Sequence, residues 1–331
     1  MDNKVKCSIA KKTSIGGQAL MEGIMMRGPK RTVMVVRRSN GEKVIEDVYI
    51  KPLFTGKITR IPIVRGVFNF IESMRLGYSS LMRSADISTL EEIRQEDAPN
   101  TEGMSEEEKK KAIEAYEKKD KIITNIVMVL SFVISIALAL GLFIFLPVFL
   151  SDLCFKNVDA VYGNTFLRSL FEGVIKFLIF LGYMYGVSFM KEIKRTFMYH
   201  GAEHKTIFCY ESGLDLTVEN VKKMSRFHPR CGTSFIVIML IVGILVGMLI
   251  PSSIGIFRPI LKVLLLPLVM GIGYEVIKYA GKHDNWFIRI ISAPGLWFQK
   301  ISTKEPTDDM IECAIEALTA VIPDDHSDII D

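Results

Sequence analysis

Three residues in the middle of the chain have the spacing of a metal-binding helix. His200, Glu203 and His204 form the pattern H-x-x-E-H within "YHGAEHKTIFCYESG". On a helix the two imidazoles lie one turn apart on the same face, so both can reach one ion, with the glutamate beside them. A glutamate in this position can take a proton from a water activated by the metal. The pattern therefore predicts a divalent metal, with zinc preferred, and Glu203 as the catalytic base.

Three other residues are candidates for further ligands. His228 and Cys231 form the turn-like pattern "HPRC", and Glu275 lies near the end of an apolar run in "GIGYEVIKYAG". Imidazole nitrogen, thiolate sulfur and carboxylate oxygen are all zinc ligands. Each candidate also has a structural interpretation. "HPRC" is equally a proline-containing turn with a buried thiol, and Glu275 is equally an ion-pair partner of Lys278, three residues later on a helix.

Two coordination shells follow from these candidates, and the sequence leaves both open. If His200 and His204 bind with one of Glu275 or Cys231, a fourth position stays open. Zinc then lowers the pKa of its bound water to about 7. If His200, His204, His228 and Cys231 all bind, the shell is closed and the metal is structural.

The N-terminal segment adds two charged candidates among apolar residues. Glu22 and Arg27 lie in "ALMEGIMMRG" and could reach the same surface as the metal motif. Alternatively, they form the polar face of an amphipathic helix. The neighbouring methionines favour core or membrane contact over copper binding, because no His or Cys accompanies them.

Long apolar runs must position these residues. Residues 122–151 and 231–257 contain no charge, and each exceeds the roughly 20 residues that a helix needs to cross a bilayer. Two further runs carry charges only near their ends, where long side chains can reach the interface. The predicted spans are residues 122–151, 170–190, 231–257 and 256–280. We therefore expect an α-helical polytopic membrane protein with about four transmembrane helices in a lipid bilayer.

Basic residues predict the orientation of these spans. Residues 191–233 contain eight Lys and Arg residues, whereas the loop after the first span has only Lys156 and Arg168. By the positive-inside rule, the basic loop and both termini face the cytoplasm. The first 30 residues lack the apolar core of a signal peptide. We therefore expect a multi-pass protein of the bacterial inner membrane with its metal site on the cytoplasmic side.

Composition limits the compartment and the partners. The five cysteines are an odd number without a disulfide-type spacing, which favours a reducing compartment. The net charge is +4, with both signs spread along the chain. Such a small excess argues against nucleic acid as a partner. The expected partners are the lipid bilayer and other membrane proteins.

The pattern divides the chain into four parts. Residues 1–85 form a small cytoplasmic α+β region, and residues 86–121 form a charged linker helix with a capping box at Ser105 and Glu108. Residues 122–285 form the membrane domain with its loop 191–233. Residues 286–331 form an interfacial segment, a closing amphipathic helix and an acidic tail.

Local patterns predict the elements of these parts. Residues 14–31 show i,i+4 apolar pairs, which predict a short amphipathic helix. Residues 32–50 contain two β-rich runs around Asn40-Gly41, which predict a hairpin. A surface or packed helix is expected at 61–84. The second span should continue as one helix to Gly213, and a short helix should follow at 217–226.

Several long blocks resemble one family in order. They are "GGQALMEGIMMRGP", "YHGAEHKTIFCYE", "LTVENVKKMSRFHPRCGTSF", "GIGYEVIKYAGKH" and "SAPGLWFQK". Together they resemble the bacterial YqhQ family, membrane proteins of unknown function provisionally labelled predicted metal-dependent enzymes. The resemblance covers about residues 16–320 and implies a metal and a reaction without naming either. It directs attention to Glu22, Arg27, His200, Glu203, His204, His228, Arg230, Cys231 and Glu275. The likeness of H-x-x-E-H to inverted zincin peptidases is local only.

Two functions fit this sequence. The first is a metal-dependent hydrolase that acts on a membrane-associated substrate at the cytoplasmic face. The second is a non-enzymatic scaffold or assembly factor that binds other membrane proteins and holds a structural metal or none. Replacing Glu203 by Gln should separate them, because only the hydrolase needs a base at that position.

Overall fold

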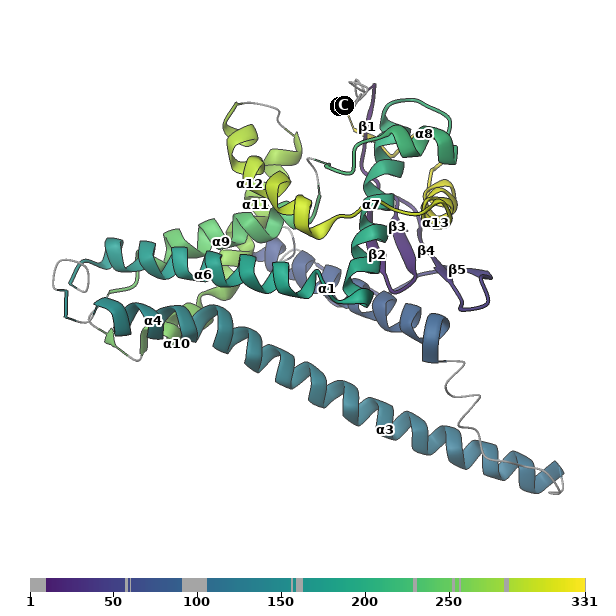
Figure 1. The fold of residues 1–331 in the computed structure, drawn as a ribbon, viewed down its shortest axis with the longest axis horizontal. Helices are drawn as coiled ribbons and strands as arrows, with labels where there is room; N and C mark the ends of the chain where they lie inside the picture. The colour runs from purple at the N-terminus through teal and green to yellow at the C-terminus, as the bar shows by residue number, and fades with distance from the viewer. Residues whose placement is uncertain are drawn as a thin grey trace.

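The computed structural model shows two regions, a mixed α/β head and a set of apolar helices (Figure 1). The described residues are 10–56, 59, 61–90, 106–155, 157–158, 163–228, 231–251, 254–255, 257–282 and 286–330.

The head is built on a four-stranded antiparallel sheet. Its strands are β2 (Gly16–Leu20), β3 (Gly23–Arg27), β4 (Thr32–Arg37) and β5 (Lys43–Asp47), in the order β2-β3-β4-β5. Gln18 lies opposite Met25 on β3, and Met25 lies opposite Met34 on β4. The predicted hairpin at Asn40-Gly41 is confirmed as the β4–β5 connection. Gly41 has a φ of 88°, which favours glycine.

The helix predicted for residues 14–31 is wrong, because this segment forms β2 and β3. Ile24 and Met26 pack into one buried cluster, whereas Leu20 and Met25 pack into a second. Both faces of the sheet are therefore covered. A strand buried on both faces reads as a continuous apolar run without the polar alternation of a half-exposed strand. The i,i+4 pairs in this run reflect its overall apolar content.

Helices cover both faces of this sheet. On one side lie α7 (Lys191–Glu211), the short α8 (Val218–Lys223) and α13 (Asp308–Thr319). On the other side lies α1 (Val64–Ala85), followed by η2 (Asp86–Leu90). The predicted short helix, closing amphipathic helix and packed helix at 61–84 are thus confirmed. The two ends of the chain meet where β1 (Lys12–Thr13) pairs with β6 (Ile329–Ile330), a contact that the sequence did not predict.

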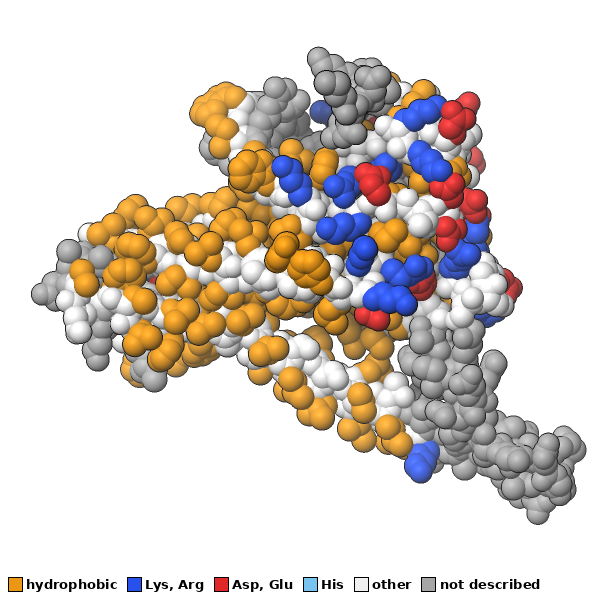
Figure 2. All heavy atoms as spheres, viewed as in Figure 1, with side chains coloured by type: hydrophobic (Ala, Val, Ile, Leu, Met, Phe, Trp, Pro, Cys, Tyr) orange, Lys and Arg blue, Asp and Glu red, His pale blue; other side chains and the backbone are white. Residues whose placement is uncertain are grey.

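Two continuous apolar helices are long enough to cross a membrane. The first is α3 (Glu106–Leu140), which runs through η3 (Gly141–Phe145) into α4 (Leu146–Phe155) and contains a candidate span at residues 122–155. The second is α6 (Thr165–Val187), capped by the Asn164 side chain. Hydrophobic side chains cover α4, α6 and the part of α3 from Ile122 onward, while charged side chains gather over the head (Figure 2). The capping box at Ser105 lies outside the described residues.

The other two predicted spans are less regular. In the third, α9 (Thr233–Gly247) has only 15 residues. In the fourth, α10 (Phe257–Leu264) and α11 (Leu266–Lys282) meet at an angle of 46°, next to Pro267. Proline at the start of a helix prevents the preceding turn from continuing regularly. The described part of the chain therefore has two candidate spans, or three if the bent pair counts as one. The last helix of this region is α12 (Trp286–Ser302).

The second span does not continue as one helix to Gly213. The helix α6 ends at Val187, and Met190 has an extended conformation with ψ 134° before α7 begins. The two helices then run in different directions, α6 along the apolar region and α7 against the sheet (Figure 1). A regular periodicity on both sides of a break does not reveal a change of direction. The predicted end of α7 is confirmed, with Gly213 at φ 70°.

Candidate metal centre

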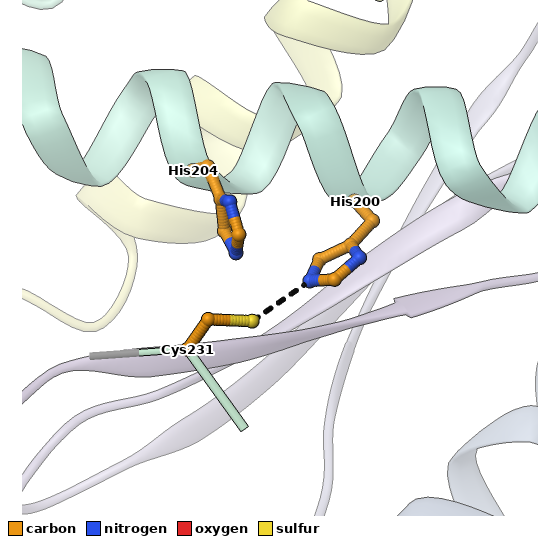
Figure 3. A group of neighbouring side chains, drawn as sticks. All are labelled: His200, His204 and Cys231. Carbon is orange, nitrogen blue, oxygen red and sulfur yellow. Dashed lines mark hydrogen bonds between the residues drawn. The ribbon is translucent and has the colours of Figure 1, made fainter. Parts of the chain in front are cut away.

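The structure brings His200, His204 and Cys231 together. One ligand atom from each side chain lies within 4.8 Å of the other two. Figure 3 shows both imidazoles projecting from the same side of α7 toward the sulfur of Cys231. Cys231 belongs to the segment that leads directly into α9. The predicted convergence of two histidines on one helix with Cys231 is therefore confirmed, and this group could hold a metal ion.

Backbone carbonyls fix the tautomer of both histidines. His200 Nδ1 lies 2.9 Å from the carbonyl oxygen of Ser302, and His204 Nδ1 lies 2.6 Å from that of Arg226. Because a carbonyl only accepts, we assign the proton to Nδ1 in each ring, which then donates. Both Nε2 atoms therefore carry lone pairs. This is the arrangement in which metal-binding histidines are usually held.

The Nε2 atom of His204 is buried, no described side chain lies at ordinary hydrogen-bond geometry from it, and Cys231 is the side chain that interacts with the ring. The side chain is 2% exposed, and burial, as the largest cause, lowers the pKa of His204. The ring is therefore neutral, as metal binding requires. An unsatisfied buried acceptor costs about 1–3 kcal/mol. A metal ion would remove that cost.

One distance in the group can be compared with that of two ligands that share a metal ion. Tetrahedral coordination with Zn–N and Zn–S bonds of about 2.0–2.3 Å places neighbouring ligand atoms about 3.5 Å apart. The His200 Nε2 atom lies 3.2 Å from Cys231 Sγ, close to that value. The donor chemistry and the geometry of these residues thus fit a transition-metal ion.

Glu203 lies beside this group and is held from the sheet. Its Oε1 accepts the backbone N–H of Gly17 on β2 at 3.1 Å, and the residue is 6% exposed. Burial raises the pKa of Glu203, and the nearby His200 and the Gly17 N–H oppose this shift. The carboxyl group is thus buried, oriented and more basic than an exposed glutamate.

Gly17 makes this approach possible, and its role was not predicted. A Cβ at this position would lie 2.9 Å from Cγ and Cδ of Glu203 and 2.8 Å from Sδ of Met26. The strand can therefore reach the glutamate only where it has no side chain. The Gly16-Gly17 pair does not indicate this contact in the sequence. Its meaning depends on Glu203, which is 186 residues away.

A cavity of about 110 Å³ lies beside His204 and Cys231. Its walls include Gly17, Glu203, His204, Glu211, His228 and Cys231. An open groove of about 590 Å³, lined in part by Arg27, shares Gly16 and Gly17 with the cavity. The two glycines thus separate the buried site from a hollow on the surface.

His228 lies next to the three-residue group but is engaged elsewhere. Its ring centroid is 5.8 Å from that of His204, and its Nε2 lies 3.2 Å from Oε2 of Glu211. Its backbone exchanges two hydrogen bonds of 2.8 Å with the Gln299 side chain. The structure therefore groups three of the four residues of the predicted closed shell. The buried Glu211 was not singled out from the sequence.

Glu275 does not lie in this group. Its carboxylate forms a two-point ion pair with Arg65 on α1, with Arg65 Nε 2.6 Å from Oε1. An ion pair was the alternative that the sequence allowed, but its partner is Arg65 rather than Lys278. A contact across 210 residues was not visible in the helical spacing.

The other candidates fall at different places. Glu22, at the β2–β3 turn, pairs with Arg195 on α7 and lies 3.4 Å from the hydroxyl group of Tyr199. Arg27 is exposed at the end of β3 and faces the open groove. Arg230 lies outside the described residues. Glu22 therefore ties the sheet to α7, while Arg27 lines a surface next to the site.

The fold and the site together define the class of protein to which this chain belongs. This is a mostly helical protein with two or three helices suited to cross a membrane and a His/Cys group that could hold a metal ion.

Within that class the chain belongs to the family described as "Protein of unknown function (DUF1385)", whose model matches residues 61–324. It is 36% identical over 312 residues to "Uncharacterized protein YqhQ" of Bacillus subtilis (strain 168), covering 93% of this chain and 92% of that protein. The family resemblance of the sequence blocks is thus confirmed. No solved structure matches this chain.

Proposed function

We propose that this protein is a metal-dependent hydrolase that acts on a membrane-associated substrate at the cytoplasmic face of the bacterial inner membrane. In this proposal the chain crosses the membrane four times, through α3–α4, α6, α9 and α10–α11, and both termini are cytoplasmic. The exposed apolar surface of α3 and α6 supports this placement. So do the exposed Trp286 and Trp297 of α12, since tryptophan favours the membrane interface.

The observation that carries the proposal is the convergence of the buried His204 Nε2 with the side chains of Cys231 and His200. Three protein ligands with a fourth position left open are typical of catalytic zinc sites. A zinc ion held there supplies a Lewis acid and a water that is activated near neutral pH. The His₂Cys donor set suits zinc better than magnesium or calcium, which prefer oxygen ligands.

Glu203 is the base in this proposal. A general base works best when its pKa lies near the pH of the cell, and burial moves the pKa of Glu203 upward. The Gly17 N–H holds one carboxylate oxygen and so sets the direction in which the other can accept a proton. Substrate would enter through the groove beside Gly16 and Gly17.

Metal analysis of protein purified in detergent tests this proposal. We expect about one zinc ion per wild-type chain, and a much lower content after His204→Ala. The Glu203→Gln protein should retain the metal and the fold but should fail to restore the wild-type phenotype in cells that lack the gene. Wild-type protein without stoichiometric transition metal, or a fully functional Glu203→Gln variant, would contradict the hydrolase.

A structural metal in a membrane scaffold is the second candidate. One observation favours it: the histidines lie on α7 of the head, whereas Cys231 leads into α9, so a metal would tie the two regions together. Under this alternative, Glu203→Gln is silent while His200→Ala destabilises the protein. The same set of variants therefore separates the two functions.

A further inference from the structure

A second cavity lies among the apolar helices, away from the metal centre. It has a volume of about 270 Å³ and is bounded by α6, α9, η3 and the α10–α11 pair. Most of its wall is apolar and includes Phe143, Phe180, Leu240, Val246, Leu265 and Val269. Three charged residues also line it, namely Glu172, Lys176 and Lys262. This is a hydrophobic hollow with charge on one wall.

Most of the charge at this wall belongs to a paired network. Glu172 is 2% exposed and accepts hydrogen bonds from Arg168 at 3.2 Å and from Arg258 at 3.1 Å. It also pairs with Lys262. Arg168 reaches a second carboxylate, that of Asp152. Among the described residues, this network and Lys176 thus place four cations against two carboxylates.

Lys176 is the cation that this network leaves out. It lies one turn after Glu172 on α6, is partly buried, and lines the cavity. No described residue forms a hydrogen bond or ion pair with its ammonium group. A charged group in a membrane-spanning segment is unfavourable unless it is paired or reaches water, and it marks a functional site by default. The missing partner here is an anion.

We propose that this cavity binds one amphiphile with an acyl chain and an anionic headgroup. The acyl chain lies against the apolar wall, and a phosphate or carboxylate of the headgroup pairs with Lys176 and Lys262. A small inorganic anion would satisfy the ammonium but leave the apolar wall unfilled. The combination of an apolar hollow with surplus positive charge therefore selects an anionic lipid or a fatty acid. This site does not depend on the metal centre.

Native mass spectrometry of the full-length protein in detergent tests this site. The probes are dioleoyl phosphatidate, oleate and, as the zwitterionic reference, dioleoyl phosphatidylcholine. We expect one copy of phosphatidate or oleate to bind at least about tenfold more tightly than phosphatidylcholine, because only the first two carry net negative charge. A tenfold difference in affinity corresponds to about 1.4 kcal/mol. Comparing phosphatidate with oleate identifies the headgroup. Equal binding of all three probes would overturn the proposal.

Two pairs of variants separate charge from volume. Lys176→Gln should reduce the preference for the anionic probes, whereas Lys176→Arg should keep it. Gly243→Leu should block binding by filling the hollow, because Gly243 lines the cavity and a Cβ there meets only Val269 at 4.0 Å. Gly182→Leu is the matched control, since Gly182 is exposed on α6 and has open space around it. Unchanged binding in folded Lys176→Gln and Gly243→Leu proteins would contradict this site.

Discussion

The head and the apolar helices each contain a polar cluster that is at least partly buried. The two clusters differ in the charge of the ligand that each would bind. In the head, the buried Nε2 lone pair of His204 faces the Cys231 side chain without a hydrogen bond of ordinary geometry among the described residues. In the apolar region, the ammonium group of Lys176 lies beside a network in which Glu172 already serves three cations. The first site calls for a cation and the second for an anion. The two proposals thus assign ligands of opposite charge to the head and to the apolar helices.

Both clusters combine a local pair on one helix with residues from distant segments. Arg168 and Glu172 lie one turn apart on α6, and Arg258 of α10 joins them. The two histidines of the metal group lie one turn apart on α7, and Cys231 joins them from the segment before α9. A local pair closes at low entropic cost, but sites for ligands are assembled from several segments.

Removing the centre of the network should have the largest effect on stability. Glu172→Gln leaves Arg168 and Arg258 buried without their shared carboxylate, and breaking a buried ion pair costs about 3–5 kcal/mol. Urea unfolding in detergent measures this loss. The control, Glu219→Gln, breaks an exposed pair with Lys223 and should cause no measurable change. A stable Glu172→Gln protein would show that the network is not held by this residue.

Metal binding should produce the next largest effect. At a zinc concentration about a hundred times its dissociation constant, the ion stabilises the folded state by about 3 kcal/mol. We expect this gain in wild-type protein and none in His204→Ala, measured by unfolding with zinc and with a chelator. His326→Asn is the control, because His326 is exposed in the tail and asparagine tolerates its φ of 53°. The same zinc response in all three proteins would place the ion elsewhere.

The contact between the sheet and Glu203 can be tested with a pair of glycines. Gly17→Ala places a Cβ against Glu203 and Met26, and overpacking of this kind costs about 1–3 kcal/mol. Gly16→Ala meets nothing within 4 Å and should change stability by less than about 0.5 kcal/mol. Chemical unfolding of both variants measures the difference. Equal stability would mean that β2 does not hold the carboxylate.

The raised pKa of Glu203 predicts a pH dependence in chelated protein. Between its ordinary pKa of about 4.3 and its higher folded value, the folded state binds more protons than the unfolded state. Glu203 therefore stabilises the fold at low pH and loses that contribution as the pH rises. Glu203→Gln removes this loss, so its stability relative to wild type should increase with pH, with a slope of at most about 1.4 kcal/mol per pH unit. A difference that is constant from pH 4 to 8 would contradict the shift.

The metal group was largely predictable, because helical spacing alone places His200 and His204 on one face. Cys231 was also a candidate third ligand, but the sequence left open whether Glu275 takes its place or His228 binds with it. The structure distinguishes His228 from Cys231 through Glu211, which engages His228 and was not singled out. Such a distinction depends on contacts between segments, which no local pattern encodes.

The sheet was harder to predict than the helices. Residues 14–31 contain two strands that helices cover on both faces, and this burial removes the polar alternation by which strands are recognised in a sequence. The turn between them has no Asn-Gly pair. Instead, Glu22 adopts a positive φ of 49°, and its carboxylate is paired with Arg195 on α7. Long-range contacts thus determine this turn.

Substitution of Glu275 should have the smallest effect on stability, and it tests whether the metal site includes a residue of α11. Its carboxylate and the Arg65 guanidinium are each about one quarter exposed, so their coupling should be about 0.5–1 kcal/mol in a double-mutant cycle with Arg65→Ala and Glu275→Gln. Zinc content should be the same in both single variants as in wild type, because neither residue lies in the metal group. Loss of zinc in Glu275→Gln but not in Arg65→Ala would make Glu275 a ligand. The metal site would then extend to a helix of the apolar region, and the separation of the two clusters would no longer hold.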